Sequence, residues 1–289
     1  MSVRSCLLHW SAAQVAEFSS RSLLSSPILS LHDVVCRGEC RHRSDEECVG
    51  ALHLVFPYRG VYVRHLGQKE VVAEANQVLF FNPEEAYSVS HPVTGGDACL
   101  SLTVEEALLR ELVPAEQIGE GGTLSFRRSR QPIDPRAQLL MALLRHSLLR
   151  GVAEPLEAET LALTLVRRSL GERSGRKLAT YGKQKLVDRA KLVLSSDLAR
   201  RWSLAEIAAE VGVSPVYLTQ AFQLVEGVPL YRYQLRLRLA RALDLLDRYD
   251  DLTDLGLELG FSSHSHFTAS FKQAYGRSPG EFRRETHLR

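Results

Sequence analysis

Cysteine and histidine residues near the start of the sequence have a spacing that suits metal chemistry. Cys36, Cys40 and Cys48 occur with His42 in the polar stretch CRGECRHRSDEECVG, and His53 follows shortly after it. Thiolates and an imidazole form tetrahedral Zn²⁺ sites, and a bound zinc ion orders a segment that has few apolar residues. The candidate zinc ligands are therefore Cys36, Cys40, Cys48 and His53. Only one pair has a standard zinc spacing, so thiols that respond to oxidants, and thiols with no special role, stay open as alternatives.

A catalytic iron site has weaker support. Cupin oxygenases hold iron through a His-x-His pair, a carboxylate and a later histidine, with open coordination positions. The β-rich first half of this sequence has no His-x-His, and His53, His65 and His91 fall on separate expected strands. We therefore expect no enzyme. A metal-binding cupin-like enzyme or storage module with a helical appendage remains the alternative.

The second half contains a unit with the signals of two short helices joined by a tight turn. In SLAEIAAEVGVSPVYLTQAF, which begins at Ser203, the S-x-x-E spacing to Glu206 predicts a capping box at a helix start. Gly212 is placed to end that helix in a left-handed conformation, and Ser214-Pro215 predicts the start of the next. This order predicts a helix-turn-helix, in which the second helix enters the major groove of DNA.

The unit occurs twice. In DLTDLGLELGFSSHSHFTASF, which begins at Asp251, Gly260 matches Gly212 and Phe271 matches Phe222. The connecting segment PLYRYQLRLRLARALDLLDRY predicts one helix of about 18–20 residues, close to 30 Å long. That length is near the one-turn repeat of B-DNA, which predicts two reading helices in successive major grooves. Two helical hairpins that only pack a core are the structural alternative.

The sequence before the repeated unit shows a strand pattern first, then a helix pattern, then a linker. From about Leu31 to Thr103, short apolar runs end in turn residues at spacings near ten, which predicts an antiparallel sandwich or barrel with a hairpin at Gly67-Gln68. Leucines at three- and four-residue steps predict two helices over 134–170, suited to a hairpin or subunit interface. The Gly-, Ser- and Lys-containing stretch that follows predicts a linker over 171–182.

Bulk composition fits an intracellular globular protein. Of the 289 residues, 45% are hydrophobic and 24% are charged, and the net charge is +2. A net charge this small argues against a histone-like polycation, but it allows a basic face on one part of the surface. No apolar run is long enough to span a bilayer, and the N-terminal residues lack the pattern of an export signal. The five cysteines are an odd number, which favours reduced thiols in the cytoplasm.

Residues from about 183 to 289 resemble the DNA-binding domain of the AraC/XylS family of transcriptional regulators. The matching residues are Ala208, Gly212, Ser214, Leu218, Phe222, Gly227, Tyr233, Arg238, Ala242, Leu245, Leu246, Leu255, Gly260, Phe261, Ser265, Phe267, Phe271, Lys272, Gly276, Pro279, Phe282 and Arg283. The resemblance implies an α+β fold: a cupin-like β-barrel sensing domain (1–133), a helical hairpin for dimerisation (134–170), a linker (171–182) and an all-α domain with two helix-turn-helix motifs (183–289). It also implies a homodimer on double-stranded promoter DNA, with RNA polymerase as a further partner.

Position on the two second helices gives the candidate DNA-contact residues. They are Pro215, Val216, Thr219, Gln220, Gln223, Ser263, His264, Thr268 and Ala269 for the groove, and Lys272 for phosphate. Arg238 is counted with this set, and an ion pair with Asp244 or Asp247 is its structural alternative. Many family members carry a basic residue where this chain has Gln220, Gln223 and Ala269, so family base contacts do not transfer directly.

Overall fold

Residues 18–38, 42–114, 124–171 and 180–287 are described by the computed structural model. Contacts divide the chain into two compact units, Met1–Glu172 and Arg173–Arg289, and each is described by itself. In its described residues the first unit contains the strands and three helices, and the second contains helices throughout its described part. The fold is therefore mixed α+β, with a sheet unit followed by a helical unit.

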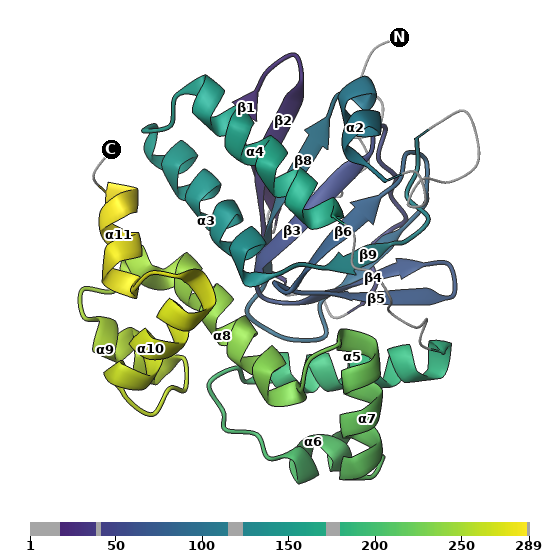
Figure 1. Cartoon of the computed structure of the whole chain (residues 1–289). Coiled ribbons are helices and arrows are strands. Elements are labelled where there is room, and N and C mark those ends of the chain that lie inside the picture. Colours follow the sequence, from purple (N-terminus) through teal and green to yellow (C-terminus); the bar gives the residue numbers. More distant parts are fainter. Residues whose placement is uncertain (1–17, 39–41, 115–123, 172–179, 288–289) are drawn as a thin grey trace. The chain divides into compact units, whose positions relative to one another are not determined.

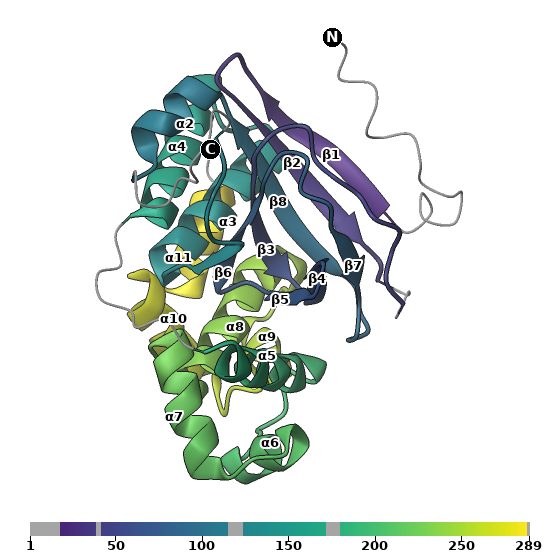
Figure 2. The same ribbon diagram turned by 90° about the vertical axis from the view of Figure 1, so that its right-hand side faces the viewer.

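Two antiparallel sheets make up the sheet unit (Figures 1 and 2). The strands are β1 (Phe18–Ser25), β2 (Leu29–Cys36), β3 (His53–Arg59), β4 (Tyr62–Leu66), β5 (Lys69–Ala73), β6 (Gln77–Phe81), β7 (Ser88–Ser90), β8 (Asp97–Val104) and β9 (Arg130–Pro132). Their order is β1-β2-β8-β3-β6-β9 in one sheet and β5-β4-β7 in the other. The expected hairpin between β4 and β5 is confirmed, with Gly67 at a φ of 57° in the turn.

The expectation of a closed barrel is corrected by this topology. Closure requires the first strand of a sheet to pair with the last. In the described residues, β1 and β9 are the two ends of the six-stranded order and pair with β2 and β6 only. The sheet unit is therefore built from two separate sheets.

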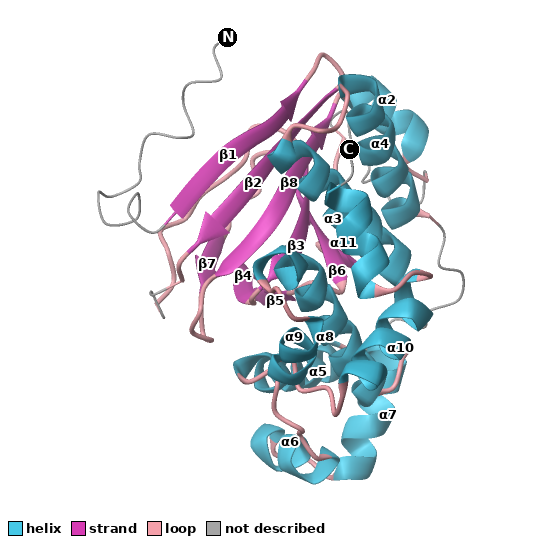
Figure 3. Ribbon diagram, turned by 90° about the vertical axis from the view of Figure 1, so that its left-hand side faces the viewer, coloured by secondary structure: helices cyan, strands magenta, loops and turns pink. Residues whose placement is uncertain are grey.

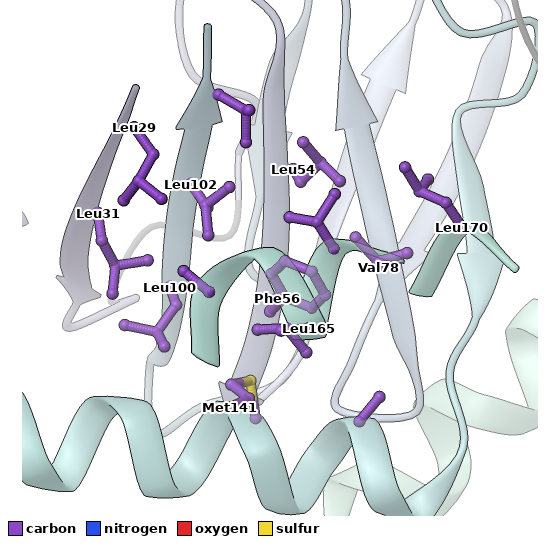
Figure 4. Packing of buried hydrophobic residues seen from close by; sticks show 14 of the residues in the cluster. Leu29, Leu31, Leu54, Phe56, Val78, Leu100, Leu102, Met141, Leu165 and Leu170 are labelled. Carbon is purple, nitrogen blue, oxygen red and sulfur yellow. The ribbon is translucent and has the colours of Figure 1, made fainter. Parts of the chain in front are cut away.

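Helices cover one face of the six-stranded sheet (Figure 3). They are α2 (Glu106–Leu112), α3 (Pro135–Arg150) and α4 (Pro155–Leu170). The carboxylate of Asp134 accepts a hydrogen bond from the Ala137 N–H at the start of α3, and Gly151 ends that helix in the left-handed conformation. Leu31, Phe56 and Leu100 of the sheet pack with Met141 of α3 and Leu165 of α4 (Figure 4). The two predicted helices of 134–170 thus pack on the sheet.

The opposite face of the six-stranded sheet packs against the three-stranded sheet. Val55, Leu79 and Cys99 from the larger sheet form a second buried cluster with Tyr62 and Val71 from the smaller one. Side chains alternate between the two faces of a strand, so β3, β6 and β8 have buried residues on both faces, whereas the edge strand β1 is largely exposed.

The helical unit has α5 (Tyr181–Ser196), α6 (Leu204–Val211), α7 (Pro215–Glu226), α8 (Leu230–Leu245), α9 (Leu252–Glu258), α10 (His264–Tyr275) and α11 (Pro279–His287). The connecting helix α8 has 16 residues, about 24 Å at 1.5 Å per residue, and is shorter than expected. A 3₁₀ turn over Leu246–Arg248 follows it and brings Leu246 into the core, while Asp247 and Arg248 stay exposed. None of the described helices is both long and apolar enough to cross a membrane.

Candidate nucleic-acid interface

The first helix-turn-helix consists of α6 and α7. The Ser203 hydroxyl accepts a hydrogen bond from the Glu206 N–H at 3.2 Å, and the Ser203 N–H donates to the Glu206 carboxylate at 2.7 Å. These bonds from Ser203, with a contact from Arg200, lower the pKa of Glu206 to about 2. Gly212 has a φ of 73° and ends α6, and the Ser214 hydroxyl accepts from the Tyr217 N–H at the start of α7. The predicted capping box and glycine turn are confirmed.

The second helix-turn-helix consists of α9 and α10. The Asp251 carboxylate accepts from the Thr253 N–H at 2.7 Å, and Gly260 has a φ of 81° in the turn. The Ser263 hydroxyl then accepts from the His266 N–H at 3.1 Å and begins α10. Gly276 ends α10 in the left-handed conformation, as Gly227 ends α7. The same local signals therefore produce the same turn twice.

Each second helix has one face in the core of the unit. Leu218 and Phe222 of α7 are fully buried, and Phe222 packs edge-on against Tyr233 of α8 with ring centroids 5.1 Å apart. Phe267 and Phe271 of α10 are also fully buried. Aromatic pairs of this kind fix the rotation of a helix about its own axis. The faces opposite these residues are therefore held in a defined direction.

The predicted groove residues lie on those opposite faces. The exposed ones are Pro215, Val216, Thr219, Gln220, Gln223, Ser263, His264, Ala269 and Lys272, and Thr268 is half-buried. Val216 is 67% exposed, so its side chain is accessible on this face. In the described part of the chain, no hydrogen bond joins the Gln220 or Gln223 side-chain amide to another residue. These amides are available to a ligand.

Some side chains of this surface already have partners. The Thr219 hydroxyl donates to the Pro215 carbonyl at 2.9 Å. Thr268 Oγ1 and His264 Nε2 lie 3.3 Å apart, one turn from each other. Tyr217, which the sequence analysis did not single out, is 43% exposed beside Val216. Its position two residues after the predicted first-turn Pro215 was the available signal.

Comparison with known proteins agrees with this architecture. A family model described as a helix-turn-helix domain matches residues 207–285. The transcriptional activator RhaR of Klebsiella pneumoniae is 29% identical over 137 residues, which cover 47% of each chain. The probable transcriptional regulator LumQ of Photobacterium leiognathi is 24% identical over 238 residues, 78% of this chain and 89% of LumQ. The chain belongs to the AraC/XylS family.

A solved AraC-type regulator from Chromobacterium violaceum is 30% identical and covers 37% of this chain and 96% of its own, with a TM-score of 0.35. The match to RhaR spans about half the length of that protein. RhaR and LumQ are named as transcriptional regulators, in agreement with the expectation that this AraC/XylS family member is not an enzyme.

Arg238 lies on α8 with its guanidinium turned into the protein, although it had been predicted to be among the DNA-contact residues. Its Nε donates to the Leu198 carbonyl at 2.8 Å and its Nη1 to the Gly260 carbonyl at 3.0 Å. Its Nη2 donates to the Ala199 and Arg200 carbonyls at 3.1 and 2.9 Å. Burial lowers the pKa of this guanidinium. Asp244, one of its two expected partners, pairs with Arg241.

Several basic residues near the helix-turn-helix units also have internal partners. Buried Lys191 lies 2.7 Å from the Glu226 carboxylate, and Arg200 lies 2.6 Å from Glu206 with its guanidinium over the Trp202 ring. Arg283 donates to the Tyr249 carbonyl at 2.8 Å. The exposed basic residues of the unit include Lys185, Arg201, Arg232, Lys272 and Arg284. They supply positive charge at the surface of this family member.

The three candidate zinc ligands within the described residues are Cys36, Cys48 and His53, and they lie in different segments of the sheet unit. Cys40 lies outside the described residues, and Cys48 is exposed. His53 Nδ1 lies 2.8 Å from the Ser101 hydroxyl on β8, and burial, with a smaller effect of His32, lowers the pKa of His53 to about 4. Cys36 is instead grouped with His91 and Asp97.

His91 and Asp97 were not among the predicted ligands. Burial opposes the charged His91 ring, but hydrogen bonds to Asp97 and Cys36 outweigh it and raise the pKa of His91 to about 10. The pairing of Cys36 with Asp97 across two strands depends on sheet register. The chain contains no local signal for that register.

Proposed function

We propose that this chain is a sequence-specific transcriptional regulator that binds double-stranded DNA in the cytoplasm. The observation that carries the proposal is the matched construction of α7 and α10. Each is the second helix of a capped helix-turn-helix, buries its aromatic or aliphatic face and presents a short polar surface to solvent. Helices with this exposure suit the major groove, which admits an α-helix and displays a distinct pattern at each base pair.

The proposed DNA-contact residues have distinct roles. An unpartnered Gln220 amide has the geometry to bond adenine N6 and N7, and the Thr219 methyl group suits contact with a thymine methyl. Lys272, exposed on α10, is assigned to phosphate. The remaining groove positions are Pro215, Val216, Gln223, Ser263, His264, Thr268 and Ala269. We assign Arg238 to the framework that holds the two units, because its donors are used on four carbonyls.

We propose that the sheet unit senses a signal, which can be a small ligand, a metal ion or a redox change, and tunes dimerisation or DNA affinity. A switch of this kind requires the signal to bind one arrangement of the protein more tightly than the other. The resemblance of the sheet unit to the cupin-like domains of the family supports a sensing role. We assign the homodimer contact to α3 and α4, and RNA polymerase is a further proposed partner.

Selection of bound sequences from a random double-stranded DNA library tests the proposal. We expect enrichment of a site with two short conserved blocks about one helical turn apart. Binding by fluorescence anisotropy to the enriched site is then compared with binding to a shuffled site. Salt-dependent binding that is equal on the two sites contradicts a sequence-specific regulator, because phosphate contacts alone produce that result.

Paired variants locate the reading surface. Gln220→Ala is expected to weaken binding to the enriched site by about 5- to 100-fold, and to relax the preference at one base position. Gln68→Ala makes the same chemical change at an exposed position of the sheet unit and is the matched control. Equal affinities for the two variants would remove α7 from the proposed reading surface.

A metal-dependent enzyme or storage module is the less favoured reading. The named relatives are transcriptional regulators. In that alternative the helical unit would be only an appendage. Residues 207–285 of that unit, however, match the helix-turn-helix family model.

A further inference from the structure

Three side chains with different donor atoms converge at one end of the sheet unit. Cys36 is the last residue of β2 and Asp97 is the first residue of β8, and the two stand opposite each other in the antiparallel register. His91 directly follows β7. One ligand atom from each residue lies within 4.8 Å of the other two, and His91 Nε2 lies 2.7 Å from Asp97 Oδ1. A thiol, an imidazole and a carboxylate thus point at one small volume.

Glycine residues hold the backbone tightly around this cluster. A Cβ on Gly96 would lie 2.3 Å from the Cys36 carbonyl oxygen, and one on Gly38 would lie 2.7 Å from the Gly96 Cα. A Cβ on Gly38 would also lie 3.2 Å from Cδ2 of the His91 ring. Gly38 and Gly96 both have positive φ values, of 65° and 67°, which side chains rarely adopt. The donor positions are therefore fixed by close backbone packing.

Solvent has limited access to the donors. The His91 and Asp97 side chains are 11% and 8% exposed, and Cys36 is half-buried. The Tyr62 ring lies 6.4 Å from the His91 ring and belongs to the buried cluster between the two sheets. The half-buried Cys36 thiol gives an ion a route of entry. The more deeply buried His91 and Asp97 side chains supply preorganised ligands.

We propose that Cys36, His91 and Asp97 bind a divalent ion of the zinc class. Thiolate, imidazole and carboxylate are the ligand types of protein zinc sites, and a thiolate disfavours Mg²⁺ and Ca²⁺. In tetrahedral zinc the donor atoms are roughly 3.5 Å apart, so these donors need shifts of only about 1 Å. Three protein ligands leave a fourth position for water or a small ligand. Two anionic ligands balance the charge of the ion.

This site differs from the set that sequence spacing suggested, since it shares only Cys36 with that set. It is formed by the register of β2 and β8 and by the residue after β7. The proposal concerns metal binding by the sheet unit and does not depend on DNA binding by the helical unit.

Cobalt titration of the full chain tests the site. The protein is purified with a reductant, stripped with a chelator and titrated with Co²⁺, whose absorption spectrum reports thiolate ligation. We expect one Co²⁺ per chain with a thiolate-to-metal charge-transfer band that Zn²⁺ abolishes. Cys36→Ser is expected to abolish the band and to weaken zinc binding by more than about 100-fold, beyond the 10- to 100-fold effect of an outer hydrogen-bond partner.

Matched variants separate this site from other thiols. Cys48→Ser changes an exposed cysteine of the same unit and is expected to retain the band and the zinc affinity. His91→Gln and Asp97→Asn are expected to keep the band and to weaken binding, and circular dichroism verifies that each variant is folded. A wild-type chain without the band, or a band that survives Cys36→Ser, overturns the proposal.

Discussion

His53 makes the stability of the sheet unit depend on pH. It lies on β3, and burial holds its pKa near 4, below the ordinary value of 6.5. Between these values an unfolded chain binds a proton at His53 and the folded chain does not. Protonation therefore favours the unfolded state, and stability is complete above pH 6.5 and falls as the pH falls toward 4.

We predict that His53→Gln reduces this acid sensitivity. Between pH 7 and 4.5, the free energy of unfolding of the sheet unit is expected to fall by about 2 kcal/mol more in the wild type than in the variant. The raised pKa of His91 has the opposite sign, but His91 is present in both proteins and its contribution cancels in their comparison. Urea unfolding at the two pH values measures the difference. A pH dependence that is the same in both proteins would show that His53 is not the group responsible.

At the scale of elements, the helix-turn-helix units were predictable because their signals are local. The Ser203–Glu206 capping box, the turn at Gly212 and the first-turn Pro215 each act within a few residues, and each is found in the structure. The sheet unit depends on pairings distant in sequence, such as Cys36 with Asp97. A strand pattern indicates which residues share a face but not which strand is the neighbour. For that reason the pattern left a sandwich and a barrel open, and the Cys36–His91–Asp97 cluster could not be predicted.

Arg238 shows how elements of the helical unit are joined. From α8 it donates to carbonyls of the segment between α5 and α6 and to the Gly260 carbonyl between α9 and α10 (Figure 1). Gly260 also approaches that segment closely, since a Cβ there would lie 2.1 Å from the Ala199 oxygen. One side chain therefore joins the segment that leads into the first helix-turn-helix to the turn of the second.

Removal of this side chain is expected to weaken the whole helical unit. Arg238→Ala removes the side-chain donor from the Leu198, Ala199 and Gly260 carbonyls and leaves the Arg200 carbonyl with the Gln234 amide. We predict a loss of about 3 kcal/mol in the free energy of unfolding. Arg238→Lys is expected to fall between the wild type and the alanine variant, because an ammonium group cannot reach all four oxygens in a plane. Arg284→Ala changes an exposed arginine of the same unit and is expected to cost less than about 0.5 kcal/mol. Chemical denaturation compares the three. Equal losses for Arg238→Ala and Arg284→Ala would contradict the assigned role.

At the scale of the whole molecule, the proposed dimer contact uses side chains of α4 that stay exposed after the helix has packed on the sheet. Its inner residues, such as Ala162 and Leu165, are fully buried, but Leu156 is 75% exposed. Leu163, seven residues further on, lies on the same side of the helix and is half-buried. A second copy of the chain would cover these side chains, and a regulator of two-part DNA sites gains affinity when two copies bind together.

Leu156→Asp tests this arrangement without damage to the core. A charge at a position that is 75% exposed in the single chain has little effect on folding, whereas in a dimer contact it would be buried against a second copy without a partner. We therefore predict that the variant sediments as a monomer at concentrations where the wild type is a dimer, with an unchanged circular dichroism spectrum. Leu257→Asp makes the same change at a 52% exposed leucine of α9 and is expected to leave the dimer intact. A wild-type chain that sediments as a monomer, or a Leu156→Asp variant that remains dimeric, would exclude α4 as the contact.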